Sequence, residues 1–179
     1  MSIHRRFIQV CGDDPWPYWY GERPQVGLLA AAVWLENGVA LEEHSVKKLK
    51  ERKRKRGRND LYLNIDKTLF ECEAKRVPLN LGGNTKAGAA KVSKVLDWAI
   101  DDVKHLDGKK GLALCFVTLQ ILRKKSSDME PKLRLLRDSV RKKSDALVWI
   151  GVDEANKLPG ELSGEKWLFP GLLLAIVEK

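Results

Sequence analysis

The sequence predicts an α/β protein with a mixed central β-sheet flanked by helices. Three patterns support this class: helical spacing of apolar residues over 86–107, alternating residues in the two stretches 60–66 and 68–77, and an apolar run over 111–121. Because helical and strand patterns follow one another along the chain, we expect layers of helix packed on a shared sheet.

The length supports one compact unit. A chain of 179 residues with 44% hydrophobic residues can build one substantial core but not two large ones. We therefore expect a single domain over 1–179, with its core at about 22–121 and a sheet and helix extension over 122–179.

Charge and cysteine content limit the class of protein. The chain has 33 Lys and Arg against 24 Asp and Glu, a net charge of +9, which favours a polyanionic partner although it is also typical of a merely soluble protein. Cys11, Cys72 and Cys115 show no zinc-binding spacing, which indicates a reduced protein. The run Val26 to Leu35 is half a membrane span, and the amino end lacks an apolar signal region, so we expect a cytoplasmic protein with no membrane contact.

The first elements are an aromatic segment and a helix. The segment from Asp13 to Pro24 crowds aromatic residues between prolines and is irregular; packing on the core is the preferred interpretation, and stacking on bases is the alternative. The stretch from Pro24 to Glu36 predicts a helix that is apolar almost all round and therefore buried, with Asn37 and Gly38 as its carboxyl cap.

The next segment is ambiguous and then strongly basic. Residues 39–46 fit either a continued helix or a strand. Residues Lys47 to Arg58 hold nine basic residues and one acid, and such a run is typical of a solvated loop.

Two alternating strands follow. The stretches "DLYLNID", residues 60–66, and "TLFECEAKRV", residues 68–77, each have period two and predict a hairpin that turns at Asp66 and Lys67.

The carboxyl-terminal half predicts further helices and strands. The helix over 86–107 should end at Gly108, and Ser127 with Glu130 forms a potential capping box for a helix reaching Lys142. Strands are expected over 111–121, 146–152 and 172–177. The stretch "LGGNTKAG", residues 81–88, lacks the spacing of a phosphate-binding loop and predicts a turn into a helix.

The second strand of the hairpin carries charged residues at alternate positions. Glu73 and Lys75 share one face of the strand, and Asp60 on the neighbouring strand can approach them. Converging carboxylates suit Mg²⁺ or Mn²⁺, and a lysine beside that metal can hold or help deprotonate a water, which together allow hydrolysis of a phosphodiester. The plain alternative is a solvated strand face with cross-strand ion pairs, and Glu71 is expected to be exposed or to support the ligands from behind.

Asp60 followed by Glu73-Ala74-Lys75 resembles the PD-(D/E)XK nuclease superfamily, the restriction-endonuclease-like fold. Its core consists of a helix, a three-stranded meander, a helix and a strand (αβββαβ), and this order favours a strand at 39–46. Asn59 stands where the family name has proline. The resemblance implies that Asp60 and Glu73 bind Mg²⁺ or Mn²⁺ and that Lys75 positions the attacking water. It also implies an acid from the first helix, for which Glu22 is preferred over Glu36.

These features together predict a metal-dependent nuclease that hydrolyses DNA, with DNA favoured over RNA. The alternatives are a non-catalytic basic nucleic-acid-binding module with a degenerate nuclease fold, and a structural or regulatory protein. A homodimer or a partner protein would suit paired cuts in a duplex. The basic residues expected to contact phosphates are Lys53, Arg54, Lys55, Arg56, Arg58 and Arg76.

Overall fold

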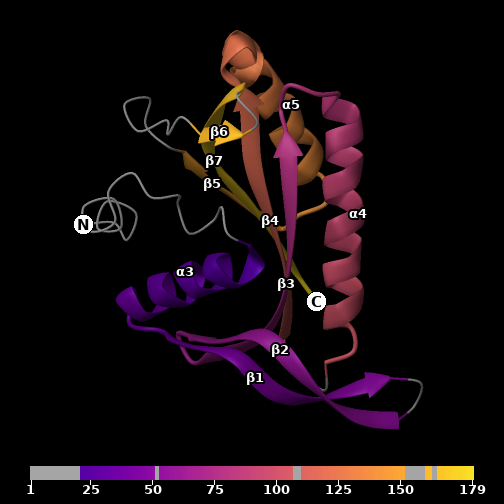
Figure 1. Cartoon of the computed structure of the whole chain (residues 1–179). Coiled ribbons are helices and arrows are strands. Elements are labelled where there is room, and N and C mark those ends of the chain that lie inside the picture. Colours follow the sequence, from indigo (N-terminus) through magenta and orange to yellow (C-terminus); the bar gives the residue numbers. More distant parts are fainter. Residues whose placement is uncertain (1–20, 51–52, 107–109, 152–159, 163–164) are drawn as a thin grey trace.

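The computed structural model describes residues 21–50, 53–106, 110–151, 160–162 and 165–179 (Figure 1). Most of the aromatic segment that begins at Asp13 lies outside these residues, as does Cys11. The elements, in chain order, are α3 (Glu22–Leu35), β1 (Val39–Lys50), β2 (Lys53–Ile65), β3 (Thr68–Asn80), α4 (Thr85–Val103), β4 (Lys110–Leu122), the 3₁₀ helix η1 (Arg123–Asp128), α5 (Met129–Arg141), β5 (Ala146–Gly151), β6 (Gly160–Leu162) and β7 (Glu165–Glu178).

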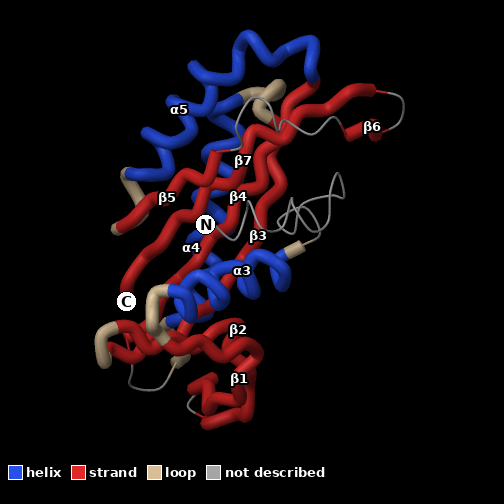
Figure 2. Tube along the Cα trace, turned by 90° about the vertical axis from the view of Figure 1, so that its left-hand side faces the viewer, coloured by secondary structure: helices blue, strands red, loops and turns tan. Residues whose placement is uncertain are grey.

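The described strands form one mixed sheet, which confirms the α/β class. Its order is β1-β2-β3-β4-β7-β5, with β6 pairing to β7. Strands β1, β2 and β3 are an antiparallel meander, whereas β3 and β4 run parallel. Helix α3 lies on one face of this sheet, and α4 and α5 lie on the other (Figures 1 and 2).

Strand β3 lies between two apolar layers, and its successive side chains point alternately into one layer and the other. Cys72 and Ala74 belong to the core under α3, while Val77 and Leu79 belong to the core under α4. Glu73 and Lys75 have the parity of Val77 and therefore lie on the α4 side. The side of the sheet on which Glu73 and Lys75 lie thus follows from which helix covers each face of β3.

Glu71 is buried, which excludes the exposed alternative of its prediction and leaves the supporting role as a prediction. Strand β3 is internal to the sheet, and Glu71 pairs in register with Tyr62 of β2 on one side and with Gly111 of β4 on the other. Glu71 has the parity of Val77, so it lies on the face of β3 that α4 covers, and the alternation alone does not reveal which face is covered.

The predicted hairpin is confirmed, but the prediction of a loop for the basic run before it is wrong. Asp66 and Lys67 both have positive φ, 49° and 64°, as a tight two-residue turn requires. Residues 47–50 and 53–58 are not a loop, because β1 and β2 remain paired as far as Lys50 opposite Lys53. Backbone hydrogen bonds extend the ladder there without an apolar face, so no hydrophobic alternation marks it in the sequence.

Helix α3 is less buried than predicted. Gln25, Val26, Ala30 and Val33 face the sheet, but Trp34 is 54% exposed. Leu35 is exposed as well, whereas Leu28 and Leu29 are partly buried against the core, so the helix is buried on one side and not all round.

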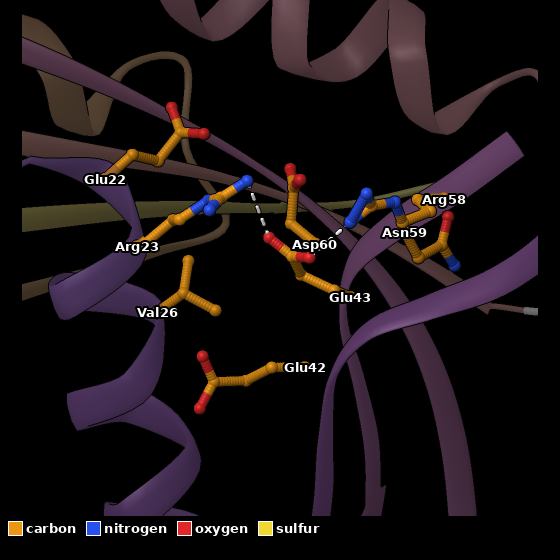
Figure 3. A pocket seen from close by; sticks show the side chains of 8 residues that line it. All are labelled: Glu22, Arg23, Val26, Glu42, Glu43, Arg58, Asn59 and Asp60. Carbon is orange, nitrogen blue, oxygen red and sulfur yellow. Dashed lines mark hydrogen bonds and ion pairs between the residues drawn. The ribbon is translucent and has the colours of Figure 1, made fainter.

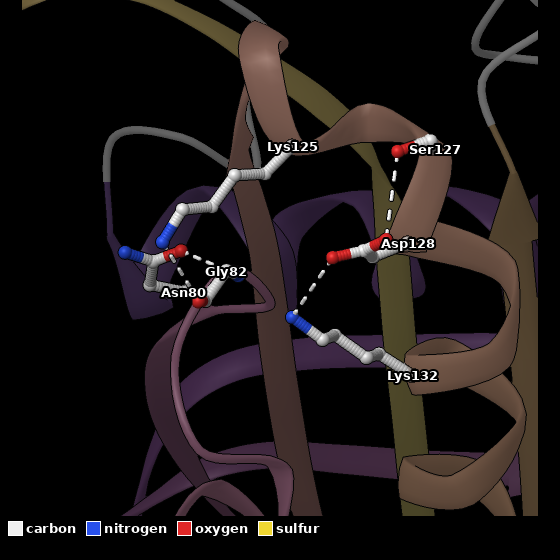
Figure 4. Close-up of polar contacts among 6 residues, drawn as sticks. All are labelled: Asn80, Gly82, Lys125, Ser127, Asp128 and Lys132. Carbon is white, nitrogen blue, oxygen red and sulfur yellow. Dashed lines mark hydrogen bonds and ion pairs between the residues drawn. The ribbon is translucent and has the colours of Figure 1, made fainter.

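The ends of α4 and α5 differ from the sequence-based boundaries. Helix α4 ends at Val103, before the expected position, and the amide of Leu106 bonds the Val103 carbonyl in the turn that follows. The expected capping box at α5 does not form, because Ser127 and Asp128 belong to η1. Ser127 instead donates to Asp128 Oδ1 at 3.5 Å, and Asp128 pairs with Lys132 at 3.7 Å (Figure 4).

The turn between β3 and α4 is built by two asparagines, as the predicted turn into a helix requires. Asn80 Oδ1 accepts from the amide of Gly82 at 2.8 Å, and Lys125 donates to the Gly82 carbonyl at 3.4 Å (Figure 4). Asn84 caps α4 by accepting from the amides of Lys86 and Ala87.

Candidate active site

The candidate site lies where β2 separates from β3. Their ladder ends at Leu61 opposite Cys72. Pairing between β1 and β2 is also interrupted at this level, because Glu43 has a φ of 50° and does not pair with Asp60. Asp60 is therefore released from both neighbouring ladders, and the edge of β3 beyond Cys72 is open to side chains.

Two carboxylates occupy that edge. Asp60 Oδ2 accepts from the backbone amide of Ala74 at 2.7 Å, and the Glu22 carboxylate accepts from the backbone amide of Arg76. Residues 74 and 76 are two apart on a strand, so their amides point to the same edge. Glu22, the first residue of α3, and Asp60 of β2 thereby meet on β3, although 38 positions separate them in the printed sequence.

Lys75 is the common neighbour of the surrounding carboxylates. Its Nζ lies 2.8 Å from Asp102 Oδ2 of α4 and interacts electrostatically with Asp60 and Glu73. Glu22 interacts with Lys75 as well. The four carboxylates of Glu22, Asp60, Glu73 and Asp102 thus face two cations, Lys75 and Arg76, which leaves an excess of negative charge.

The pKa of Lys75 is raised above its usual value. Burial disfavours the ammonium, but the bond to Asp102 and the charges of Asp102, Asp60 and Glu73 outweigh that effect. Lys75 therefore remains protonated near neutral pH. In this arrangement it can hold a water or a phosphate oxygen, but it cannot accept a proton.

The pKa of Glu22 is also raised. Burial is the main cause and the nearby Asp60 charge is the second, while Lys75 and the Arg76 amide act in the opposite direction. Glu73 is only 3% exposed. Holding several carboxylates together and out of water costs free energy that a bound cation would offset.

Arg76 is fixed inside the site. Its Nε donates to Thr118 Oγ1 at 3.1 Å, and Gln25 Nε2 donates to the same oxygen at 3.0 Å. Burial lowers the pKa of Arg76 and the Glu22 charge opposes this. Arg76 is therefore a half-buried member of the cluster and not a surface residue.

Arg58 lies beside the site in a cavity of ≈ 230 Å³ between α3 and the β1–β2 pair (Figure 3). It pairs with Glu43, which Arg23 also contacts at 2.9 Å. The contact with Arg58 is the main cause of the lowered pKa of Glu43. Because Arg58 is exposed, a phosphate could compete with Glu43 for it. The side chains of residues 53–56 lie outside the described part of the structure.

Asn59 lines the same cavity and is unusual. It is fully buried, yet neither Oδ1 nor Nδ2 has a hydrogen-bond partner within the described structure. An unsatisfied buried amide is costly, and it lies directly before Asp60.

The sequence predicted Glu22, Asp60, Glu73 and Lys75 as site residues, and the structure brings them near one another together with Asp102, which was not predicted. Nothing in the sequence marks Asp102, because only the packing of α4 on β3 brings it to Lys75. Glu36, the rejected alternative, is exposed at the far end of α3. At ~1.5 Å per residue that end lies ~20 Å from Glu22.

The carboxylate oxygens of the site suit a hard divalent cation whose remaining ligands are water or substrate oxygens. Among the described residues, no group of three or more Asp, Glu, His or Cys side chains is arranged to hold a metal. Magnesium needs only one or two carboxylates, with water and substrate oxygens completing its coordination. The oxygen ligands and the excess negative charge around Asp60 and Glu73 fit that requirement.

None of the described helices is long and apolar enough to cross a membrane. No protein-family model, curated protein or solved structure matches this chain. A function must therefore be argued from the chemistry of the site itself.

Proposed function

We propose that this protein is a metal-dependent nuclease that hydrolyses phosphodiester bonds of DNA. The observation that carries the proposal is the convergence of Glu22, Asp60 and Glu73 on Lys75 at the point where β2 leaves β3. The order α3, β1, β2, β3, α4, β4 supports a restriction-endonuclease-like core, because it repeats the helix, meander, helix and strand of that superfamily.

Asp60 and Glu73 would hold Mg²⁺ or Mn²⁺. Asp60 binds the Ala74 amide through Oδ2, which fixes its carboxylate at the strand edge. Glu73 is held by its strand position on the covered face of β3. When bound, the cation polarises the phosphoryl group and lowers the pKa of water.

Lys75 and Arg76 supply positive charge to the substrate. Lys75 stays protonated, so its role is to orient a water or a phosphate oxygen. Arg76, fixed by Thr118, can stabilise negative charge that develops on the phosphoryl group. Glu22, whose pKa is raised, completes the acidic side of the site and is the residue best suited to receive a proton from water.

The test is cleavage of single-stranded and duplex DNA with Mg²⁺, with Mn²⁺ or with EDTA. Asp60→Asn, Glu73→Gln and Lys75→Met each remove one charge at similar size. Asp97→Asn is the matched control, because Asp97 is an exposed carboxylate on α4 that pairs with Lys143 away from the site. We expect cutting by wild type and the control only with metal, and no cutting by the three site variants, all of which should fold.

Cutting in EDTA, or cutting by the folded Asp60 and Glu73 variants, would contradict the proposal. Salt-sensitive binding without cutting would favour the second candidate, a non-catalytic nucleic-acid-binding module. The observation that favours this candidate is the 2.8 Å ion pair that engages Lys75 with Asp102 in place of a substrate.

A further inference from the structure

Strands β1 and β2 continue beyond the sheet as a two-stranded ribbon. Strand β2 pairs with β3 only over Leu61 to Ile65, but it pairs with β1 as far as Lys53. Residues 45–50 and 53–58, here called the basic ribbon, thus have only each other as strand neighbours in the described structure. Figure 1 shows this ribbon running past the lower end of α4.

The register of the basic ribbon places like charges opposite one another. The directly opposed pairs are Lys47 and Arg56, Lys48 and Lys55, and Lys50 and Lys53. Residues 45–50 and 53–58 contain no acid. Opposed like charges destabilise a strand pair, and a two-stranded ribbon is marginal even without them. Repulsion between these charges therefore destabilises the ribbon by itself, and a bound polyanion would offset that repulsion.

We infer that the basic ribbon enters the major groove of double-stranded DNA and makes duplex DNA the substrate of the proposed active site. The major groove of B-DNA is about 12 Å wide and admits a two-stranded β-ribbon. Both strands of the ribbon carry cations, and both walls of a groove carry phosphates, whereas a single strand offers one line of them. The deep, narrow major groove of duplex RNA excludes such an element.

The ribbon also has a defined reach from the site. Asp60 lies seven positions beyond Lys53, which at ~3.3 Å per residue is ~23 Å. One turn of B-DNA is about 34 Å, so the ribbon spans about two-thirds of a turn, or ~7 base pairs. The substrate must therefore remain double-stranded for about this distance beyond the phosphate that lies at the proposed active site.

The inference rests on the proposed nuclease function only where it says that duplex DNA is the substrate that is cut. Entry of the ribbon into the groove does not require cleavage, so it is tested by measuring DNA binding. The protein is the Asp60→Asn variant in EDTA, and the probes are a hairpin of about 20 base pairs, a hairpin of about 6, and a single strand of equal length. The ribbon variant changes Lys48, Lys50, Arg54 and Arg56 to Gln. The matched control changes four exposed basic residues of α5 and its end, Arg134, Arg137, Arg141 and Lys142, to Gln.

We expect the long hairpin to bind at least about tenfold more tightly than the short hairpin or the single strand. The ribbon variant should lose this preference, and the slope of log K against log salt should fall by about 3 to 4, since each phosphate contact contributes about 0.9. The α5 variant has the same net charge as the ribbon variant, but it should keep both the preference for the long hairpin and the wild-type salt slope. The ribbon variant should also melt at or above the wild-type temperature, because the opposed charges are gone.

The inference is overturned if the ribbon variant keeps the preference and the slope, if the α5 variant loses them equally, or if wild type binds the single strand as tightly as the long duplex. If duplex binding depends on the basic ribbon but the protein never cuts DNA, the inference is supported and the nuclease proposal is contradicted. If the ribbon variant cuts duplex DNA with metal as well as wild type does, the nuclease proposal is supported and the inference is contradicted.

Discussion

Asp60 has two separable roles, and substituting it in two ways tells them apart. Its Oδ2 accepts from the Ala74 amide at 2.7 Å, and Ala74 is 0% exposed. Asp60→Ala leaves that amide buried and unpaired, at a cost of about 1–3 kcal/mol. In a chain of this size, 1 kcal/mol shifts the melting temperature by about 2–4 °C, so the expected loss is about 2–12 °C.

Asp60→Asn keeps an oxygen acceptor for the same amide. It exchanges a charge-assisted hydrogen bond for a neutral one, and it removes the repulsion between Asp60 and Glu22. These effects oppose each other, so we expect stability within about 1 kcal/mol of wild type. Cleavage should nevertheless fall by about 10²-fold or more in both variants, because each lacks the carboxylate that would hold the metal.

The assay is thermal unfolding by circular dichroism in EDTA, followed by cleavage in Mg²⁺. Asp97→Ala is the control, because Asp97 is an exposed acid with a surface ion pair to Lys143, and its loss should change the melting temperature little. Equal destabilisation by Asp60→Asn and Asp60→Ala would refute the hydrogen-bond argument. Wild-type cleavage by Asp60→Asn would refute its place in the site.

Four further outcomes test the description. Asn59→Leu should raise the free energy of unfolding by about 1–2 kcal/mol in denaturant titrations, because it removes a buried amide that has no partner among the described residues. A loss of stability would show that the amide is satisfied. Glu22→Gln should raise the melting temperature at neutral pH, because the raised pKa of Glu22 means that the folded state disfavours its ionised form. This gain should shrink as the pH falls and vanish below about pH 4.5, where Glu22 is protonated in both states. A gain that does not depend on pH would contradict this explanation. Leu96→Ala should cost about 2–5 kcal/mol, since Leu96 of α4 is fully buried in the core between α4 and the sheet. A smaller loss in denaturant titrations would mean that this core is loosely packed. Burial raises the pKa of Cys115 to about 12 and raises that of Cys72 as well, so in a Cys11→Ser background neither thiol should react with iodoacetamide before unfolding, as mass spectrometry can check.

The predictions from sequence were most accurate where hydrophobic period and turn chemistry agree. The alternation over 60–77 defined both strands of the hairpin, and the turn formed at Asp66 and Lys67 as expected. The strand over 111–121 was equally well predicted, because its apolar content matches a strand covered on both faces. The basic run failed for the opposite reason: a strand pair without an apolar face has no hydrophobic period, so its charges suggested a loop.

The candidate site divides in the same way. The spacing of Glu73 and Lys75 determined that they share a face, because strand geometry fixes the relation between residues two apart. Only the tertiary structure decided that this face lies under α4, that Asp102 pairs with Lys75, and that Glu22 and Asp60 meet on the open edge of β3. Local sequence sets which way side chains alternate, but the packing of helices and the point where two strands part depend on contacts between residues far apart in the chain, which no local pattern records.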